Sequence, residues 1–269
     1  MPCQWKAGAR ESDPPTTTGV AKRPSLKKQR NFLQRILPYL SRLHDAAGRF
    51  NHWLFPERCR ACAAPGAPLC AGCFGDWPRL PAERCSYCAL PVLDNGDCPV
   101  CAVESPAYDH VYTPFIYAEP LNTAILAWKF QQRLDWTRPL ADAWASAWGE
   151  HPPSHPDALL PVPLHRQRLR ERGYNQSLLL ARHWGKHWSI PVIPGVLRRR
   201  RHTGHQLGLS AAARRDNLDA AFALRGHVPD HVAVVDDVLT TGTTAAQIAG
   251  TLRDAGVQRI DIWVLARAL

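Results

Sequence analysis

The sequence lacks any long apolar stretch. No run approaches the roughly 18 residues that a helix needs to span a bilayer. The N-terminal segment MPCQWKAGARESDPP has no apolar core of the kind found in signal peptides. A chain of 269 residues with 45% hydrophobic residues is nevertheless long enough to bury a full core. We therefore expect a cytoplasmic globular protein with no membrane span, built as one large domain or two modest ones.

Two nucleotide-binding motifs are also missing. There is no Gly-x-x-x-x-Gly-Lys sequence, which excludes a P-loop, and no Gly-x-Gly-x-x-Gly follows a predicted strand, which disfavours a dinucleotide-binding fold. The formal net charge is nevertheless +10. A basic chain of this kind favours an anionic partner, either nucleic acid or phosphorylated small molecules.

Cysteine is abundant and regularly spaced. Eight of the nine cysteines form four Cys-x-x-Cys pairs, and Cys3 is left over without a predicted role. In a reducing compartment such pairs are typical of zinc knuckles, and a redox or disulfide role is the weaker alternative. We expect two zinc ions, whose eight thiolates would lower the working charge to about +6. The predicted ligands are Cys59, Cys62, Cys70, Cys73, Cys85, Cys88, Cys98 and Cys101.

The cysteines lie in a segment, residues 56–105, that holds few large apolar side chains, so bound metal should supply most of its stability. The short intervals favour ligation in sequential order, although spacing alone leaves interleaved pairing open. Residues 1–30 are basic and polar, which favours a disordered tail over a nucleic-acid-binding arm. Residues 31–55 have apolar side chains at helical spacing, typical of a helix packed on the next domain rather than on a membrane surface.

Residues 106–269 alternate between strand-like and helical patterns. The strand candidates are YDHVYTPFIYAE, ALLPVPL, PVIPGVLRR, HVAVVDD and RIDIWVLAR, and helical segments such as NQSLLLARHWGKHW and TTAAQIAGTLRDAG separate them. Strands that alternate with helices predict right-handed βαβ units and a mostly parallel sheet flanked by helices. The fold class is therefore α/β, and ligands should bind beyond the carboxyl ends of the strands.

The segment VAVVDDVLTTGTTAA, residues 232–246, combines a buried strand with two acids and a hydroxyl-rich turn. We expect Asp236 and Asp237 at the carboxyl end of the strand, where they could hold the vicinal hydroxyls of a sugar and a hydrated divalent cation. Backbone amides at the start of the next helix would hold one phosphate. A strand that merely ends in acids before a helix cap explains less of the pattern. The predicted phosphate-binding residues are Thr240, Thr241, Gly242, Thr243 and Thr244.

This segment resembles the phosphoribosyl pyrophosphate signature of type I phosphoribosyltransferases. Three further motifs, LFPERCRAC, LLPVPLHRQRLRERGYNQSLLLAR and HTGHQLGLSAAARRDNLDAAFAL, precede it in order. Together they resemble the ComF family of competence proteins, in which a double zinc ribbon is fused to a phosphoribosyltransferase-like domain. The resemblance runs from about Trp53 to the C-terminus and implies that residues 106–269 form such a domain.

The resemblance also implies roles for individual residues. In this fold the loop after the first core strand, here PVPLHRQRLRERGYNQ, holds pyrophosphate, and Arg166, Arg168 and Arg172 would bind its oxygens. A solvated basic face is the alternative for any one of these arginines. Lys129 and Gln206 match family positions, and a plain surface lysine is the alternative for the former. The arginine-rich segment from Arg198 to Asn217 corresponds to a mobile hood, either a lid over the substrate or a polyanion-binding strip.

Two functions follow from the sequence. The first is a Mg²⁺-dependent phosphoribosyltransferase in which Asp236, Asp237 and Arg172 act on phosphoribosyl pyrophosphate or a related nucleotide, with the acceptor unassigned. The second is a non-catalytic competence factor that binds single-stranded DNA and a helicase or recombination partner through its basic face and zinc ribbons. The family resemblance implies DNA uptake, natural transformation or use of external DNA for either one.

Overall fold

The computed structural model describes residues 57–199 and 221–269, which fall within one compact unit, Glu57–Leu269. The predicted tail at 1–30, the helical segment at 31–55 and Gln206 with the hood residues 200–220 lie outside these ranges. Among the described helices, none is both long and apolar enough to cross a membrane.

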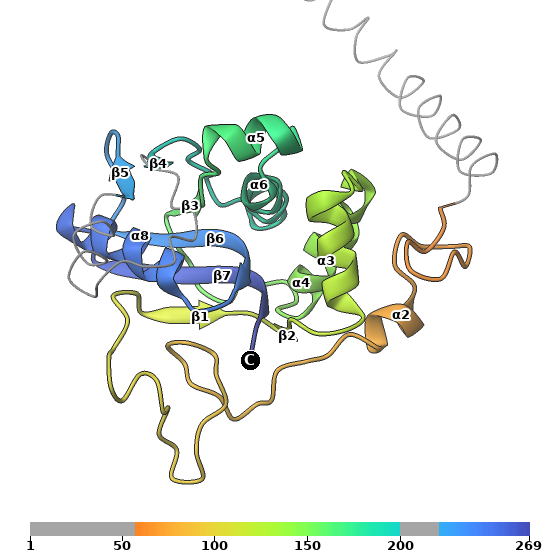
Figure 1. Ribbon diagram of the computed structural model, residues 1–269, viewed down its shortest axis with the longest axis horizontal. Helices are drawn as coiled ribbons and strands as arrows, with labels where there is room; N and C mark the ends of the chain where they lie inside the picture. Colours follow the sequence, from red (N-terminus) through yellow and green to blue (C-terminus); the bar gives the residue numbers. More distant parts are fainter. Residues whose placement is uncertain (1–56, 200–220) are drawn as a thin grey trace, which may run out of the picture. The chain divides into compact units, whose positions relative to one another are not determined.

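A parallel sheet forms the centre of the molecule. Its strands run in the order β1-β7-β6-β3, and β2 continues the β1 edge by pairing with the end of β7. Figure 1 shows β1, β7 and β6 running side by side, with α8 lying across them. The mostly parallel α/β sheet predicted from the sequence is therefore confirmed. The strands are β1 (His110–Tyr112), β2 (Phe115–Ile116), β3 (Ala158–Pro161), β6 (His231–Leu239) and β7 (Arg259–Arg267).

Helices cover both faces of this sheet, because its strands carry apolar side chains on both faces. Along β6 the side chains alternate, so that Ala233 and Val235 join one apolar cluster while Val232 and Val234 join the other. Helices α3 (Leu121–Phe130), α4 (Thr137–Ser146) and α6 (Gln176–Trp188) contribute to the first cluster, and α8 (Thr243–Asp254) contributes to the second. Because residues 232–235 of β6 are buried on both faces, the polar side chains of this strand lie at its two ends, His231 at the start and Asp236 and Asp237 toward the carboxyl end.

Tryptophans fill much of the first cluster. Trp144 of α4 and Trp184 of α6 stack with ring centroids 4.0 Å apart, and Trp263 of β7 lies 5.3 Å from Trp144. All three are fully buried. The indole of Trp144 donates a hydrogen bond of 2.7 Å to the carbonyl of Val264, which satisfies its polar atom. The stack therefore joins α4 and α6 to the middle of the sheet.

Several elements differ from the sequence prediction. The strand expected at 108–119 is divided into β1 and β2. The candidate at 191–199 adds only a single bridge to the main sheet, at Val192, and then forms β4 (Leu197–Arg199), which pairs antiparallel with β5 (Phe222–Leu224). Helix α4 and the short η1 (Leu134–Trp136) were not predicted. The expected pyrophosphate loop contains a helix, α5 (Arg166–Arg172), which His165 caps at its start and Gly173 ends with a φ of 81°.

Two helical glycines give a matched test of this packing. A methyl group at Gly185 in α6 would lie 2.6 Å from the Cγ2 of Val192 and 2.7 Å from the carbonyl oxygen of Ile190, whereas a methyl group at Gly250 in α8 meets nothing within 4 Å. We expect Gly185→Ala to lower the free energy of unfolding by about 1–3 kcal/mol because of overpacking. Gly250→Ala should raise it by roughly 0.5–1 kcal/mol through helix propensity. Urea denaturation of both variants checks this, and a Gly185→Ala protein as stable as wild type would contradict the packing.

Candidate functional site

The cysteines form two clusters in the sequential order that their spacing favoured. Within each cluster every sulfur lies within 4.8 Å of the others, and all eight cysteines are free of disulfides. The Sγ atoms of Cys88 and Cys98 are 3.4 Å apart, and those of Cys85 and Cys101 are 3.8 Å apart. A zinc ion with Zn–S bonds of about 2.3 Å needs sulfurs about 3.8 Å apart. Both tetrads could therefore hold zinc. The first cluster comprises Cys59, Cys62, Cys70 and Cys73, and the second Cys85, Cys88, Cys98 and Cys101.

Backbone amides of the knuckles favour thiolates in both clusters. The amide of Cys70 donates to the Sγ of Cys59 at 3.4 Å, and the amide of Cys101 donates to the Sγ of Cys98 at 3.5 Å. Burial alone would raise the pKa of both thiols, but the amide hydrogen bonds outweigh it and lower the pKa of Cys59 to about 6 and that of Cys98 to about 7. A thiolate is the form that binds zinc.

Three carbonyls of the turn from β6 into α8 are occupied by donors of the protein itself. The carbonyl of Leu239 accepts from the amide of Ala268 at 2.9 Å, and the buried Arg267 donates to the carbonyls of Leu239 and Thr240. The carbonyl of Gly242 accepts from Ala246 at 2.8 Å within the helix. The carbonyls of Leu239 and Thr240 are therefore directed toward the buried Arg267.

The N-cap residue of α8 offers no side chain. It is Gly242 at a φ of 80°, a left-handed conformation that favours glycine, and the hydroxyl of Thr241 instead accepts a hydrogen bond of 3.4 Å from the amide of Thr243, the first residue of the helix. The hydroxyls of Thr241 and Thr243 are hydrogen-bonded to each other at 2.9 Å, and both residues are exposed. A hollow of about 50 Å³ lies here, lined by Asp236 together with residues 240–244. The predicted phosphate-binding residues therefore gather around an exposed helix N-terminus, which attracts anions.

Asp236 lies at this hollow with its charge partly compensated. Its Oδ1 accepts hydrogen bonds of 2.9 Å from the hydroxyl of Ser177 and from the amide of Asp237. Burial, followed by the charge of Asp237, raises the pKa of Asp236 to about 7, although Lys129 and Ser177 act in the opposite direction. A carboxyl that titrates near neutrality at a strand end is typical of a functional site.

Asp237 has a different partner from its neighbour. Its carboxylate forms an ion pair of 2.7 Å with the Nζ of Lys129 in α3, and both side chains are mostly buried, at 14% and 16% exposed. Lys129 is therefore not a plain surface lysine. Asp236 lines the hollow and Asp237 does not.

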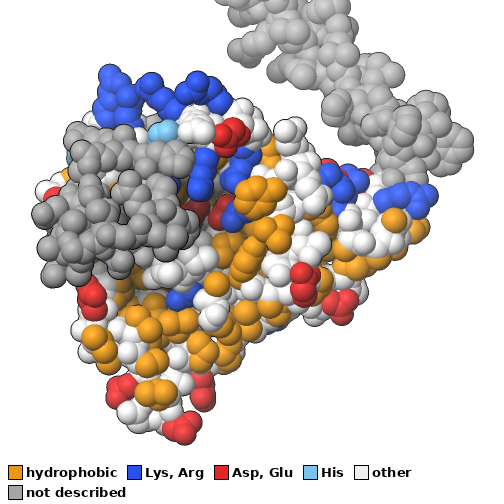
Figure 2. All heavy atoms as spheres, viewed as in Figure 1, with side chains coloured by type: hydrophobic (Ala, Val, Ile, Leu, Met, Phe, Trp, Pro, Cys, Tyr) orange, Lys and Arg blue, Asp and Glu red, His pale blue; other side chains and the backbone are white. Residues whose placement is uncertain are grey.

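The predicted arginines lie on the exposed helix α5. Figure 2 shows basic side chains gathered along the edge that α5 forms, above a hollow where acidic and basic side chains meet. The guanidinium of Arg172 lies over the ring of Phe130, 5.0 Å from its centroid. Phe130 directly follows Lys129 in the chain. Burial lowers the pKa of Arg199, the positive charge of Arg168 lowers it further, and the negative charge of Asp236 raises it. Both Arg168 and Asp236 are therefore close enough to Arg199 to act on its charge. Arg166 is exposed at the start of α5. Among the described residues, no hydrogen bond or ion pair joins it to Asp236 or Asp237.

Three functional candidates escaped the sequence analysis. Ser177 is buried and orients Asp236, and it lies at the start of α6 where Asn175 caps the helix. The capping sequence Asn-Gln-Ser after Gly173 could have revealed it. Arg199 was noticed only as part of the basic hood. Arg267 is the last residue of the apolar strand β7, and no local pattern marks it as a hydrogen-bond donor to the turn carbonyls.

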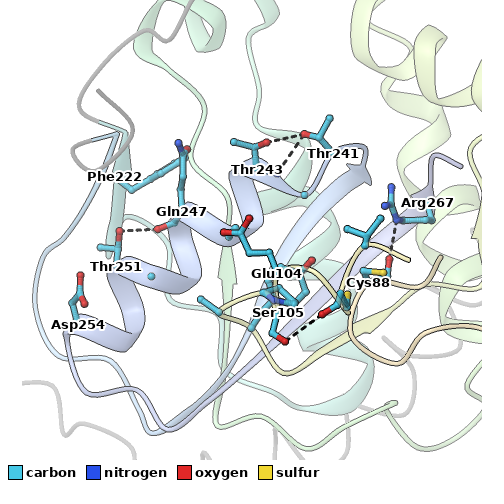
Figure 3. Close-up of a pocket in the computed structure, with 18 residues that line it drawn as sticks. Cys88, Glu104, Ser105, Phe222, Thr241, Thr243, Gln247, Thr251, Asp254 and Arg267 are labelled. Carbon is cyan, nitrogen blue, oxygen red and sulfur yellow. Dashed lines mark hydrogen bonds between the residues drawn. The ribbon is translucent and has the colours of Figure 1, made fainter. Parts of the chain in front are cut away.

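A larger cavity of about 670 Å³ lies on the other side of the turn. The chain that follows the second cluster, including Glu104 and Ser105, forms one wall, and α8 with Gln247 and Thr251 forms the other. Figure 3 shows Arg267 next to Cys88 and the Thr241 turn within this cavity. The second cysteine cluster and residues 240–244, which we call the phosphate turn after its predicted role, are therefore close neighbours.

Comparison with known proteins finds relatives over most of the chain. Competence protein F of Haemophilus influenzae is 37% identical over 209 residues, which covers 74% of this chain and 90% of that protein. The DNA utilization protein YhgH of Escherichia coli (strain K12) is 32% identical over 224 residues, covering 80% and 98%. Competence protein ComFC of Bacillus subtilis is 21% identical over 200 residues, covering 71% and 80%. No protein-family model matches the chain.

Two solved enzyme structures align with about half of the chain. Glutamine phosphoribosylpyrophosphate amidotransferase from B. subtilis aligns with a TM-score of 0.33 and 24% identity, over 48% of this chain and 24% of that one. A purine phosphoribosyltransferase from Pyrococcus horikoshii aligns with a TM-score of 0.28 and 18% identity, over 52% and 73%.

Metal analysis tests the cysteine clusters. We expect about two zinc ions per chain, since each tetrad has the sulfur spacing of a tetrahedral site. Cys98→Ser should reduce the content to about one and lower the melting temperature, because zinc binding contributes to folding. Cys3→Ser is the matched control and should retain two. A folded wild-type protein that contains no zinc would contradict the interpretation.

The raised pKa of Asp236 predicts a stability effect that depends on pH. Between the unfolded value of about 3.9 and the folded value of about 7, the folded protein binds more protons, so the free energy of unfolding falls as pH rises through this window. Asp236→Asn should therefore stabilise the protein at pH 8 by about 1 kcal/mol, or about 2–4 °C in melting temperature, and by much less at pH 5. Asp254→Asn, at the exposed end of α8, controls for loss of a carboxylate. If Asp236→Asn raised the free energy of unfolding equally at pH 5 and pH 8, the raised pKa of Asp236 would be excluded as the cause.

Proposed function

The chain belongs to the ComF family of competence and DNA-utilization proteins, and on this premise we propose that it binds phosphoribosyl pyrophosphate, or a related ribose phosphate, with Mg²⁺ at the carboxyl end of β6. In this proposal the protein serves DNA uptake or the use of external DNA. Residues 56–105 form a double zinc ribbon, and residues 106–269 form the phosphoribosyl-binding domain.

One observation carries the proposal. The carbonyls of Leu239, Thr240 and Gly242 all accept hydrogen bonds from inside the protein, so the turn offers its amides to a ligand. An exposed helix N-terminus with glycine at its N-cap suits a phosphoryl group, and Asp236 beside it suits the hydroxyls of a sugar. The amides of the turn are hydrogen-bond donors, and the carboxylate of Asp236 beside them is an acceptor. A ligand with a phosphoryl group at one end and hydroxyls at the other has the complementary groups.

The residues have distinct tasks in this proposal. Amides and hydroxyls of Thr241 to Thr244 hold the 5-phosphate, and Asp236 accepts hydrogen bonds from the ribose hydroxyls. Asp237 exchanges its ion pair with Lys129 for the sugar or for a water molecule of the cation. The freed ammonium of Lys129 and the arginines of α5 then face the pyrophosphate.

The carboxylate oxygens of both acids are donors of the type that Mg²⁺ prefers, and the cation would neutralise charge on the pyrophosphate. If transfer occurs, a nitrogen nucleophile forms a bond to the anomeric carbon. The bond from that carbon to the pyrophosphate oxygen breaks, and its electron pair leaves with the pyrophosphate. The arginines stabilise this leaving group by charge, so no covalent intermediate with the chain is required.

Calorimetry with phosphoribosyl pyrophosphate and Mg²⁺ tests the proposal. Wild type should bind, and Asp236→Asn/Asp237→Asn should bind about 100-fold more weakly, because each carboxylate loses a charge-assisted hydrogen bond. Asp94→Asn/Asp254→Asn removes two exposed carboxylates outside the site and should bind like wild type. Equal affinity in wild type and the Asp236/Asp237 variant would refute the sugar site.

A second function, single-stranded DNA binding without catalysis, is favoured by one specific observation. Phe130 is 68% exposed, and Arg172 lies over its ring beside the other arginines of α5. An exposed aromatic ring next to basic side chains suits stacked bases and a phosphate backbone. If wild type ignores phosphoribosyl pyrophosphate yet binds oligonucleotides with an affinity that falls steeply with salt, this second function replaces the first.

A further inference from the structure

The side chain of Arg267 connects the phosphate turn to the second cysteine cluster. Its Nε donates to the carbonyl of Cys88 at 2.8 Å, and its Nη1 donates to the carbonyl of Leu239 at 2.9 Å and to that of Thr240. Figure 3 marks the bond to Cys88. Arg267 is only 5% exposed, so this guanidinium is an internal group rather than a surface charge.

These hydrogen bonds determine which way the turn faces. In a trans peptide the C=O and the following N–H point in opposite directions. When Arg267 holds the carbonyl of Thr240 inward, the amide of Thr241 must point outward. The planar guanidinium reaches the cysteine knuckle and the turn at once, a geometry that lysine cannot reproduce.

The second cluster also lies beside the charge of Arg267, whose Nε donates to the carbonyl of Cys88. Four thiolates around one zinc ion would carry a net charge of about −2. A metal-bound cluster would therefore place both a carbonyl partner and negative charge next to this buried cation.

The first cluster has no such connection. Its neighbourhood is tied to the other end of the molecule by Arg60, which forms an ion pair of 3.3 Å with Asp135 in η1. Among the hydrogen bonds of the described residues, none joins the first cluster to the turn. The two clusters therefore have separate structural tasks.

We propose that Arg267 is a positioning residue, through which the second cysteine cluster holds residues 240–244 in the conformation that presents their amides to a phosphoryl group. Loss of metal from this cluster releases Arg267 and with it the turn. The inference rests on the proposed phosphoryl site, but the order of the turn can be measured without any ligand.

Arg267→Lys tests this inference, and Arg253→Lys is its matched control. Arg253 likewise donates to main-chain carbonyls, those of Ala107 and Val257, but at the far end of α8. The ¹⁵N order parameters of the amides from Thr240 to Thr244 should fall in Arg267→Lys from about 0.85 toward 0.6 or below. They should be unchanged in Arg253→Lys. Affinity for phosphoribosyl pyrophosphate with Mg²⁺ should fall at least tenfold in the first variant only.

Chelation of zinc separates the cluster from the arginine. Metal removal should loosen the turn in wild type but add little in Arg267→Lys, because the link is already broken. A turn that stays rigid in Arg267→Lys, or in chelated wild type that remains folded by circular dichroism, overturns the inference. If wild type binds no phosphoribosyl pyrophosphate while the turn still loosens as described, the positioning role stands and the proposed function fails.

Discussion

In the proposed function, the direction of three main-chain carbonyls at the end of β6 determines what this protein can bind. Arg267, Ala268 and Ala246 hold the carbonyls of Leu239, Thr240 and Gly242 inside the protein. A turn with its carbonyls outward would repel phosphate whatever side chains surrounded it. With the carbonyls inward, the helix N-terminus and the exposed threonines form a surface for an anion.

The rest of the structure supports this geometry. The middle of β6 is buried on both faces, so its polar side chains lie toward its ends, with Asp236 and Asp237 toward the carboxyl end. Its two acids are stabilised by unlike partners, Ser177 for Asp236 and Lys129 for Asp237. The raised pKa of Asp236 shows that the fold bears an energetic cost at this point, as is common where function rather than stability selects a residue.

Much of this arrangement could be predicted from the sequence, because the signals were local. Apolar runs of strand length predicted the parallel sheet, and Cys-x-x-Cys spacing predicted two clusters in sequential order. The order of strand, turn and helix in 232–246 was predicted because the three follow one another directly there, although β6 continues past both acids to Leu239. What could not be predicted depends on distant contacts. The ion pair of Lys129 with Asp237 and the bonds from Arg267 to Cys88 join residues far apart in the chain. Helix α5 was expected as a loop because its charged sequence, RQRLRER, has no apolar face to indicate a helix.

The most direct test of the outward-facing turn is a crystal structure with ribose 5-phosphate and Mg²⁺. The account predicts phosphoryl oxygens within hydrogen-bonding distance of the amides between Thr241 and Thr244, with the ribose hydroxyls on Asp236. A ligand bound only to the arginines of α5, with the turn empty or its carbonyls rotated outward, would contradict it.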